Sequence, residues 1–303
     1  MRIGLLGTGR WARDVHGPGL AASPDVDLVG VWGRDVAKAE ALAGKLGVPA
    51  FADRATLLAD VDAVSIALAP DAQSAAALEA ARAGKHLLLE KPLALDLAEG
   101  DELVRVITDK GLATVVFVTG RFQPAAEAVL DRAVEIGGWS GGRADIRVSV
   151  LSEDDAVLQA STWRVERGAL WDAAPHALSP LVTVLGTVEQ VVALEDASRA
   201  TFLTLRHESG VCSQISTTLQ APPAAFAWSV EVYGSDGRLD IPHDLNGADR
   251  YFQRAVRELA ERVGSGQPSH RVDVHFARHL LAVVVAAQRS IETGRVEQVT
   301  AAP

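Results

Sequence analysis

The first 118 residues alternate short apolar runs with longer stretches in which apolar and polar residues recur at helical spacing. Apolar runs of four or five residues, bounded by Gly, Pro or charged residues, are typical of buried strands. Such runs occupy positions 3–6, 28–32, 63–67, 86–89 and 114–118. Because strands that alternate with helices form βαβ units, this part of the chain predicts a doubly wound parallel sheet.

The stretches between these runs carry the boundary signals of helices. An alanine-rich segment begins at Asp35 and stops near Gly44, and two further segments end at Gly84 and Gly111. An aspartate at the start and a glycine after the end are typical caps of a helix. We therefore predict helices at 35–43, 72–83 and 96–109.

After residue 120 the pattern changes to strands with alternating or β-branched residues, joined by turn-like Glu208-Ser209-Gly210 and Ser235-Asp236-Gly237. These strands lie at 143–150, 201–207, 211–219 and 228–233, and helical spacing recurs at 124–136 and 273–293. The chain therefore predicts two domains, residues 1–119 and 120–303. The second is expected to be an α+β domain with a large open, mostly antiparallel sheet.

A glycine-rich turn directly follows the first predicted strand, with the sequence Gly7-Thr8-Gly9-Arg10-Trp11-Ala12. In a Rossmann fold this spacing gives a tight turn, lets the backbone approach a pyrophosphate and places the phosphates at a helix N-terminus. A plain glycine turn is the alternative, but the position between a strand and a helix favours a nucleotide. We expect residues 7–11 to contact a dinucleotide.

The end of the second predicted strand bears on the choice of cofactor. An Asp or Glu at this place normally bonds the ribose hydroxyls of NAD, whereas this chain has Gly33 followed by Arg34, with Lys38 one turn later. Positive charge here suits a 2′-phosphate, so the sequence favours NADP over NAD. Alternatively, Arg34 is a solvated loop residue and Asp35 only caps the next helix.

Composition narrows the class of protein. The chain has 29 Lys and Arg against 39 Asp and Glu, a formal charge of -10, which disfavours nucleic acid as a partner. Cys212 is its single cysteine, and no apolar run reaches the length of a membrane span. We expect a cytoplasmic protein without a membrane segment.

Residues 84–93 read Gly-Lys-His-Leu-Leu-Leu-Glu-Lys-Pro-Leu, and here the chain resembles the glucose-fructose oxidoreductase, inositol dehydrogenase and rhizopine-catabolism (Gfo/Idh/MocA) family. Residues 120–125 and 232–237 resemble that family's crossover and late strand-turn, and 168–176 resembles its glycine-rich D-x-G-x-H motif. By this resemblance Lys91 reaches nicotinamide and substrate, and Asp172 and His176 join it at the reacting centre.

The resemblance also extends to less specific positions. It implies cofactor contacts from Ala69, Pro70 and Glu90. It further suggests that the substrate pocket is lined by Arg121, Trp163 and Arg164 as well as by Lys91, Asp172 and His176.

The sequence departs from the family pattern around this pocket. The family's Thr-Pro-x-x-x-His loop lacks its threonine and histidine here, Ala174 replaces the glycine of D-x-G-x-H, and Ser179 stands where many members have a second aspartate. Thr119-Gly120 also replaces a commoner asparagine and aromatic or histidine. A sugar substrate therefore does not follow from the resemblance alone.

The three central residues suit alcohol oxidation, which needs a hydride acceptor and a group that takes the hydroxyl proton. Histidine titrates near neutrality, so His176 could be that group, with Asp172 orienting it and Lys91 polarising the oxygen or sharing the proton. Which of Lys91 and His176 is the base stays open. His275 and His279 have a spacing that can hold a metal but lack a third ligand, so we expect no metal.

We therefore expect an NADP- or NAD-dependent dehydrogenase or reductase acting on a hydroxy or keto group of a sugar, polyol or related small molecule. Two alternatives are a dinucleotide-binding sensor without catalysis and a non-redox enzyme that uses nicotinamide transiently. The open sheet also predicts a homo-oligomer, either a dimer or a tetramer.

Overall fold

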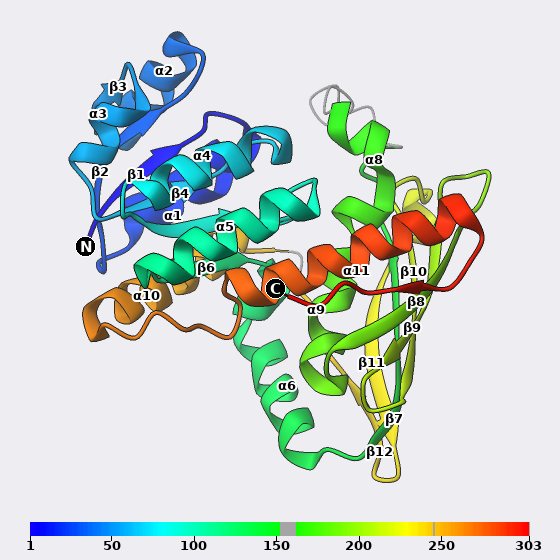
Figure 1. The fold of residues 1–303 in the computed structure, drawn as a ribbon. Coiled ribbons are helices and arrows are strands. Elements are labelled where there is room, and N and C mark those ends of the chain that lie inside the picture. Colours follow the sequence, from blue (N-terminus) through cyan, green and yellow to red (C-terminus); the bar gives the residue numbers. More distant parts are fainter. Residues whose placement is uncertain (152–161, 245, 303) are drawn as a thin grey trace. The chain divides into compact units, whose positions relative to one another are not determined.

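The computed structural model describes residues 1–151, 162–244 and 246–302. Contacts between these residues divide the chain into two compact units. Unit 1 contains residues 1–122 and 245–278, and unit 2 contains residues 123–244 and 279–303. Helix α11 (Val274–Thr293) begins in unit 1 and continues in unit 2 (Figure 1).

Unit 1 is a Rossmann fold, as predicted. In the described residues its sheet has six parallel strands in the order β3-β2-β1-β4-β5-β6. The strands are β1 (Arg2–Leu6), β2 (Asp27–Trp32), β3 (Ala50–Phe51), β4 (Ala63–Ile66), β5 (His86–Glu90) and β6 (Thr114–Phe117). The strand order reverses between β1 and β4, and in such sheets ligands bind at the carboxyl ends of the strands beside this point.

Helices follow the strands of unit 1 and mostly match the expected positions. They are η1 (Ala12–His16), α1 (Gly17–Ala22), α2 (Val36–Leu46), α3 (Arg54–Ala59), α4 (Pro70–Arg82), α5 (Leu97–Lys110), η2 (Thr119–Phe122) and α10 (Ala248–Ser265). Asp35 and Asp96 accept hydrogen bonds from the first-turn amides of α2 and α5, and Gly47 and Gly111 end these helices in left-handed conformation.

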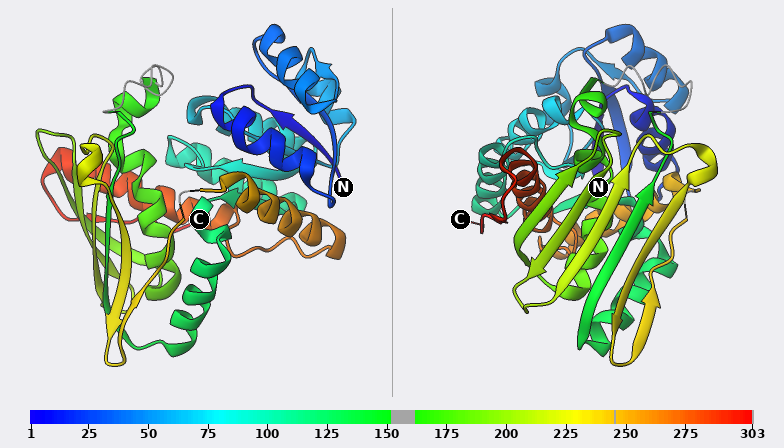
Figure 2. Two further views of the ribbon diagram at one scale, coloured as in Figure 1. Left: turned by 180° about the vertical axis from the view of Figure 1, so that it is seen from behind. Right: turned by 90° about the vertical axis from the view of Figure 1, so that its right-hand side faces the viewer.

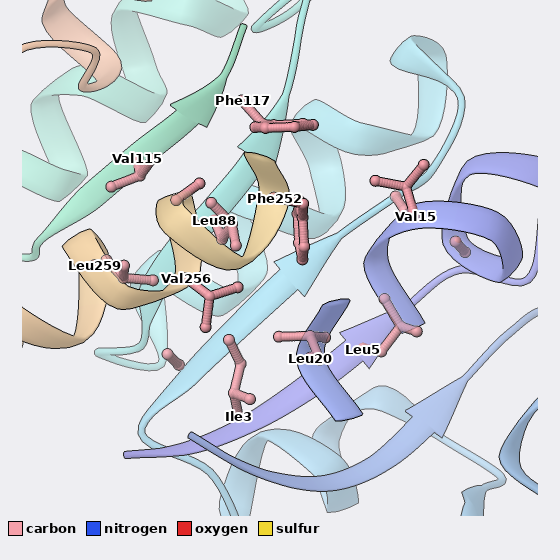
Figure 3. Packing of buried hydrophobic residues seen from close by; sticks show 14 of the residues in the cluster. Ile3, Leu5, Val15, Leu20, Leu88, Val115, Phe117, Phe252, Val256 and Leu259 are labelled. Carbon is pink, nitrogen blue, oxygen red and sulfur yellow. The ribbon is translucent and has the colours of Figure 1, made fainter. Parts of the chain in front are cut away.

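Helix α10 corrects the expected division of the chain at residue 119. It comes late in the sequence, yet Phe252, Val256 and Leu259 are fully buried in the core of unit 1. Figure 3 shows these side chains facing Ile3 of β1 and Leu88 of β5. Because this sheet buries both faces, it needs cover from a segment distant in the sequence, and α10 supplies it.

Unit 2 contains the expected large, mostly antiparallel sheet. In the described residues it has seven strands in the order β12-β11-β7-β10-β9-β8-β13, of which β7 and β10 pair in parallel. The strands are β7 (Trp139–Arg147), β8 (Val188–Glu195), β9 (Thr201–His207), β10 (Cys212–Thr218), β11 (Ala227–Gly234), β12 (Gly237–Asp240) and β13 (Glu297–Gln298).

The helices of unit 2 cover one face of this sheet, and the opposite face is open along the described part of the chain (Figure 2). The helical segments are α6 (Pro124–Ile136), α8 (Thr162–Asp172), α9 (Ala174–Leu185), η3 (Pro223–Ala225) and the later part of α11. Among the described helices, none combines the length and hydropathy required to cross a membrane.

Candidate functional site

The glycine-rich turn after β1 has the geometry of a phosphate loop. The Gly7 N–H donates to the Trp32 carbonyl at 2.8 Å, and Gly7 has a φ of +134°, at which a Cβ would overlap the Ala67 carbonyl oxygen. Gly9 is exposed, and no described atom lies within 4 Å of where its Cβ would be. The loop therefore brings the ends of β1 and β4 together and leaves backbone open at the place where a pyrophosphate would approach.

A pocket of about 540 Å³ lies at the carboxyl end of β2. Its lining includes Trp32, Arg34, Arg54 and Ala69, with Glu79 paired to Arg54 at 2.6 Å. The Arg54 guanidinium lies 4.8 Å from the centre of the Trp32 ring. A flat aromatic surface and two basic side chains fit the adenosine end of a dinucleotide.

Two further residues define the edge of this pocket. A Cβ at Gly33 would lie 2.5 Å from Thr8 Cγ2, so the position preferred for an NAD-type acid is closely packed against the phosphate loop. Lys38 is not among the lining residues and instead lies 3.6 Å from the Asp35 carboxylate. Of the predicted basic pair, only Arg34 lines the pocket.

A hydrogen-bond network connects the helix after the phosphate loop to the end of β5. The Trp11 indole N–H donates to Glu90, and the same carboxylate oxygen lies 3.0 Å from His16 Nε2. His16 Nδ1 lies 2.8 Å from the Ser65 hydroxyl, and the ring packs 4.1 Å from that of Phe252. His16 is fully buried and links the two elements.

The segment that follows β5 is held by a residue from α4. The Gln73 amide donates to the carbonyls of Glu90 and Pro92 at 2.7 and 2.9 Å, and its oxygen accepts from the Glu90 N–H at 3.0 Å. These bonds lie on both sides of Lys91, which is followed by a cis peptide bond. Gln73 was not among the site residues predicted from the sequence. A polar residue on the alanine face that α4 buries is the signal that could have found it.

Asp172 and His176 lie in unit 2, on either side of the break between two helices. Asp172 is the last residue of α8 and His176 lies in the first turn of α9. The Asp172 carboxylate is 2.9 Å from Arg164 Nε, and the Arg164 guanidinium lies 4.7 Å from the Trp163 ring centre. Three predicted residues, Trp163, Arg164 and Asp172, are therefore brought together.

Beside His176 stands a stack of aromatic rings that the sequence did not predict. Trp228 of β11 stacks on His243 with ring centres 3.8 Å apart and planes 4° apart, and its ring centre is 5.7 Å from that of His176. Gln123 fixes the end of this stack through the backbone of Asp244. Burial lowers the pKa of His243 to about 4, although Asp244 opposes the shift, so His243 is neutral at pH 7.

The remaining candidates have local roles in the structure. Arg121 is 3% exposed and lies over the Phe276 ring at 5.6 Å, within unit 1. His275 lies 3.4 Å from the Thr108 hydroxyl, and His279 accepts the Val188 N–H at 3.1 Å. Among the described residues, no three His, Cys, Asp or Glu side chains come together as a metal site.

Fold and site together define a dinucleotide-binding oxidoreductase with a separate α+β unit. The NAD-binding Rossmann profile of the Gfo/Idh/MocA oxidoreductase family matches residues 1–118, and the Gfo/Idh/MocA C-terminal domain profile matches residues 135–240. The chain belongs to this family, as the motif around Lys91 indicated.

Known relatives cover nearly the whole chain. The myo-inositol 2-dehydrogenase of Thermotoga maritima is 30% identical over 97% of both chains. The D-xylose 1-dehydrogenase (NADP(+)) 2 of Haloferax volcanii is 27% identical over 97% of this chain and 98% of its own. Among solved structures, GenD2 from gentamicin A biosynthesis in complex with NAD has a TM-score of 0.86 at 21% identity, covering 99% of this chain and 97% of its own.

Proposed function

We propose that this protein is a dehydrogenase or reductase that prefers NADP and acts on a CH–OH or keto group of a sugar, polyol or related small molecule. The observation that carries the proposal is the hydrogen bond from Trp11 to Glu90. It ties the helix after the phosphate loop to the residue that precedes Lys91. The backbone that carries Lys91 is thereby linked to the phosphate loop within unit 1.

The cofactor preference rests on the pocket at the end of β2. Arg34 and Arg54 line it, and the close approach of Thr8 to Gly33 disfavours a larger acidic residue there. Asp53 also lines the pocket, where its carboxylate accepts hydrogen bonds from the Thr56 hydroxyl and amide as a helix cap, and Glu79 is paired with Arg54. In this proposal the Arg34 guanidinium is therefore the main partner of a 2′-phosphate.

In this proposal a polar side chain takes up the proton of the substrate hydroxyl, and Lys91 and His176 are the two candidates. When bound, a nicotinamide dinucleotide accepts or supplies the hydride. The acceptor is either the Lys91 side chain in its neutral amine form or the His176 imidazole. Where His176 accepts the proton, Asp172 of the same unit, held by Arg164, stabilises the positive charge that results. The stacked rings of Trp228 and His243 offer a flat apolar wall beside His176, which suits the carbon face of a ring substrate.

The open face of the sheet in unit 2 supports a homo-oligomer. Val192, Leu194 and Phe202 are 37%, 66% and 45% exposed on neighbouring strands, and they line a hollow of about 620 Å³. Large exposed apolar side chains of this kind often mark a protein interface. Light scattering of the wild type and of Leu194→Asp tests this, because the variant is expected to shift the molecule toward the monomer.

The cofactor proposal is tested by titrating NADPH and NADH into the wild type and Arg34→Ala. Loss of one guanidinium–phosphate bond is expected to weaken NADPH binding by about tenfold and to leave NADH binding unchanged. Arg105→Ala is the matched control, because Arg105 is an exposed arginine of unit 1 that does not line the pocket. Equal affinity of the wild type for both dinucleotides would contradict the preference.

Catalysis is tested by a screen of sugars and polyols for turnover, followed by Lys91→Ala. Loss of a proton-transfer group is expected to lower kcat by about 10²- to 10⁴-fold, whereas Lys110→Ala, at the exposed end of α5, should retain activity. Tight dinucleotide binding without turnover of any substrate would favour the sensor, and no binding of either dinucleotide would overturn the proposal.

A further inference from the structure

Gln73 is buried at a place where an apolar residue would be usual. It is 1% exposed on α4, and the same helix face buries Ala76, Ala77 and Ala80. An amide in such a position lowers the stability of the protein unless its polar atoms are bonded. The amide group of the Gln73 side chain bonds to the backbone of Glu90 and Pro92, which lie outside α4.

These bonds replace the sheet partners that the backbone loses at the end of β5. Glu90 is the last residue of the strand, and Lys91 and Pro92 continue beyond the sheet. Gln73 supplies one acceptor and two donor bonds there, at 2.7 to 3.0 Å, directly before and after Lys91. The position of the Lys91 backbone is thus set from both sides by a single side chain.

We propose that Gln73 is a positioning residue that fixes the start of the Lys91 side chain relative to the phosphate loop. An effect of Gln73 on the catalytic rate rests on the proposed function of Lys91. The restraint that Gln73 places on the backbone around Lys91 does not depend on that function. Lys91 has a long, flexible side chain, so where its ammonium group lies depends on how firmly its backbone is held. A displacement of about 1 Å at a reacting group can lower the rate by about 100-fold.

Two substitutions at Gln73 distinguish the bond that its side chain accepts from the two bonds that it donates. Gln73→Leu removes all three bonds at similar volume. Gln73→Glu keeps the acceptor for the Glu90 N–H but replaces the donor to the Glu90 and Pro92 carbonyls by an oxygen. Ser74→Ala is the matched control, because it removes a bond from the neighbouring residue of α4 to Glu99, which is not part of the Lys91 segment.

The first measurement needs neither cofactor nor substrate. Hydrogen exchange of the Glu90 amide is expected to be about tenfold faster in Gln73→Leu than in the wild type, and unchanged in Gln73→Glu and Ser74→Ala. Unchanged exchange in Gln73→Leu would overturn the restraint. If Gln73→Leu does not fold, the comparison is made with Gln73→Ser, whose side chain is too short to span these bonds.

The second measurement is steady-state kinetics with the best substrate from the screen. Gln73→Glu is expected to lower kcat by about 10- to 100-fold with NADPH affinity within about twofold of the wild type. Unchanged kcat in Gln73→Glu, or a loss confined to cofactor affinity, would overturn the positioning role. If the wild type binds no dinucleotide, the proposed function fails, while hydrogen exchange still decides whether Gln73 restrains the Lys91 segment.

Discussion

Replacing Glu258 by glutamine tests the ionic network that holds the crossover segment after β6. The Glu258 carboxylate of α10 accepts hydrogen bonds from Arg254 Nε at 2.8 Å and from Arg271 Nη1 at 2.6 Å, and it lies 2.8 Å from His270 Nε2. Arg271 in turn donates to the Arg121 carbonyl of η2 at 3.0 Å. Glutamine keeps the size of the side chain but removes its charge and one acceptor oxygen.

The expected magnitude follows from the pKa of the carboxyl. Burial would raise the pKa of Glu258, but hydrogen bonds from His270 and Arg271 outweigh it and lower the pKa from 4.5 to about 2. At about 1.4 kcal/mol for each pH unit, this corresponds to about 3 kcal/mol of stability at pH 7. The side chain is 13% exposed, so we expect solvent screening to leave a loss of about 2–3 kcal/mol.

Urea unfolding at several pH values measures this loss. Because the folded-state pKa lies below that of the unfolded chain, the stabilisation is fully present above about pH 5 and is lost as the pH falls toward 2. The difference between wild type and Glu258→Gln should therefore shrink between pH 5 and pH 2. Glu261→Gln, an exposed change on the same helix, is the control. A loss of equal size at pH 7 and pH 2.5 would refute the reasoning.

Two further changes probe the cores and the ring stack. Phe252→Ala removes a fully buried ring that packs against His16, and it should lower the free energy of unfolding by about 3–5 kcal/mol in urea, whereas Phe226→Ala, 47% exposed, should change it little. Since burial lowers the pKa of His243 to about 4, unit 2 should lose stability as the pH falls from about 6.5 toward 4. Trp228 stacks on His243, so its fluorescence should change with a midpoint near pH 4. His243→Asn should abolish this change, and a midpoint that persists in the variant would assign the transition to another group.

The Rossmann half of the protein could be predicted because its signals are local. Five of the six strands of its described sheet, the caps at Asp35 and Asp96 and the glycine turn after β1 all depend on residues close together in the sequence. The short strand β3 and the helix α3 after it were not predicted, since two residues carry no periodic pattern.

The second half was predicted less completely. Its sheet type and helices α6 and α11 were foreseen, whereas β8, α8, α9 and α10 were not. Helix α8 contains a left-handed Gly168, and α9 contains Pro180, so the usual boundary signals fall inside these elements. The parallel pairing of β7 with β10 depends on which strands meet in space, and alternation along each strand does not encode it.

The sequence by itself determined the family, the parallel sheet, the phosphate loop and the identity of the candidate residues Lys91, Asp172 and His176. Tertiary structure alone decided that α10 completes the first core, that Gln73 holds the Lys91 segment and that Trp228 stacks on His243. The physical reason is the distance along the sequence between the residues that interact. Turns, caps and strand patterns depend on neighbouring residues, whereas burial of a core and hydrogen bonds to a strand end join positions that are remote along the chain.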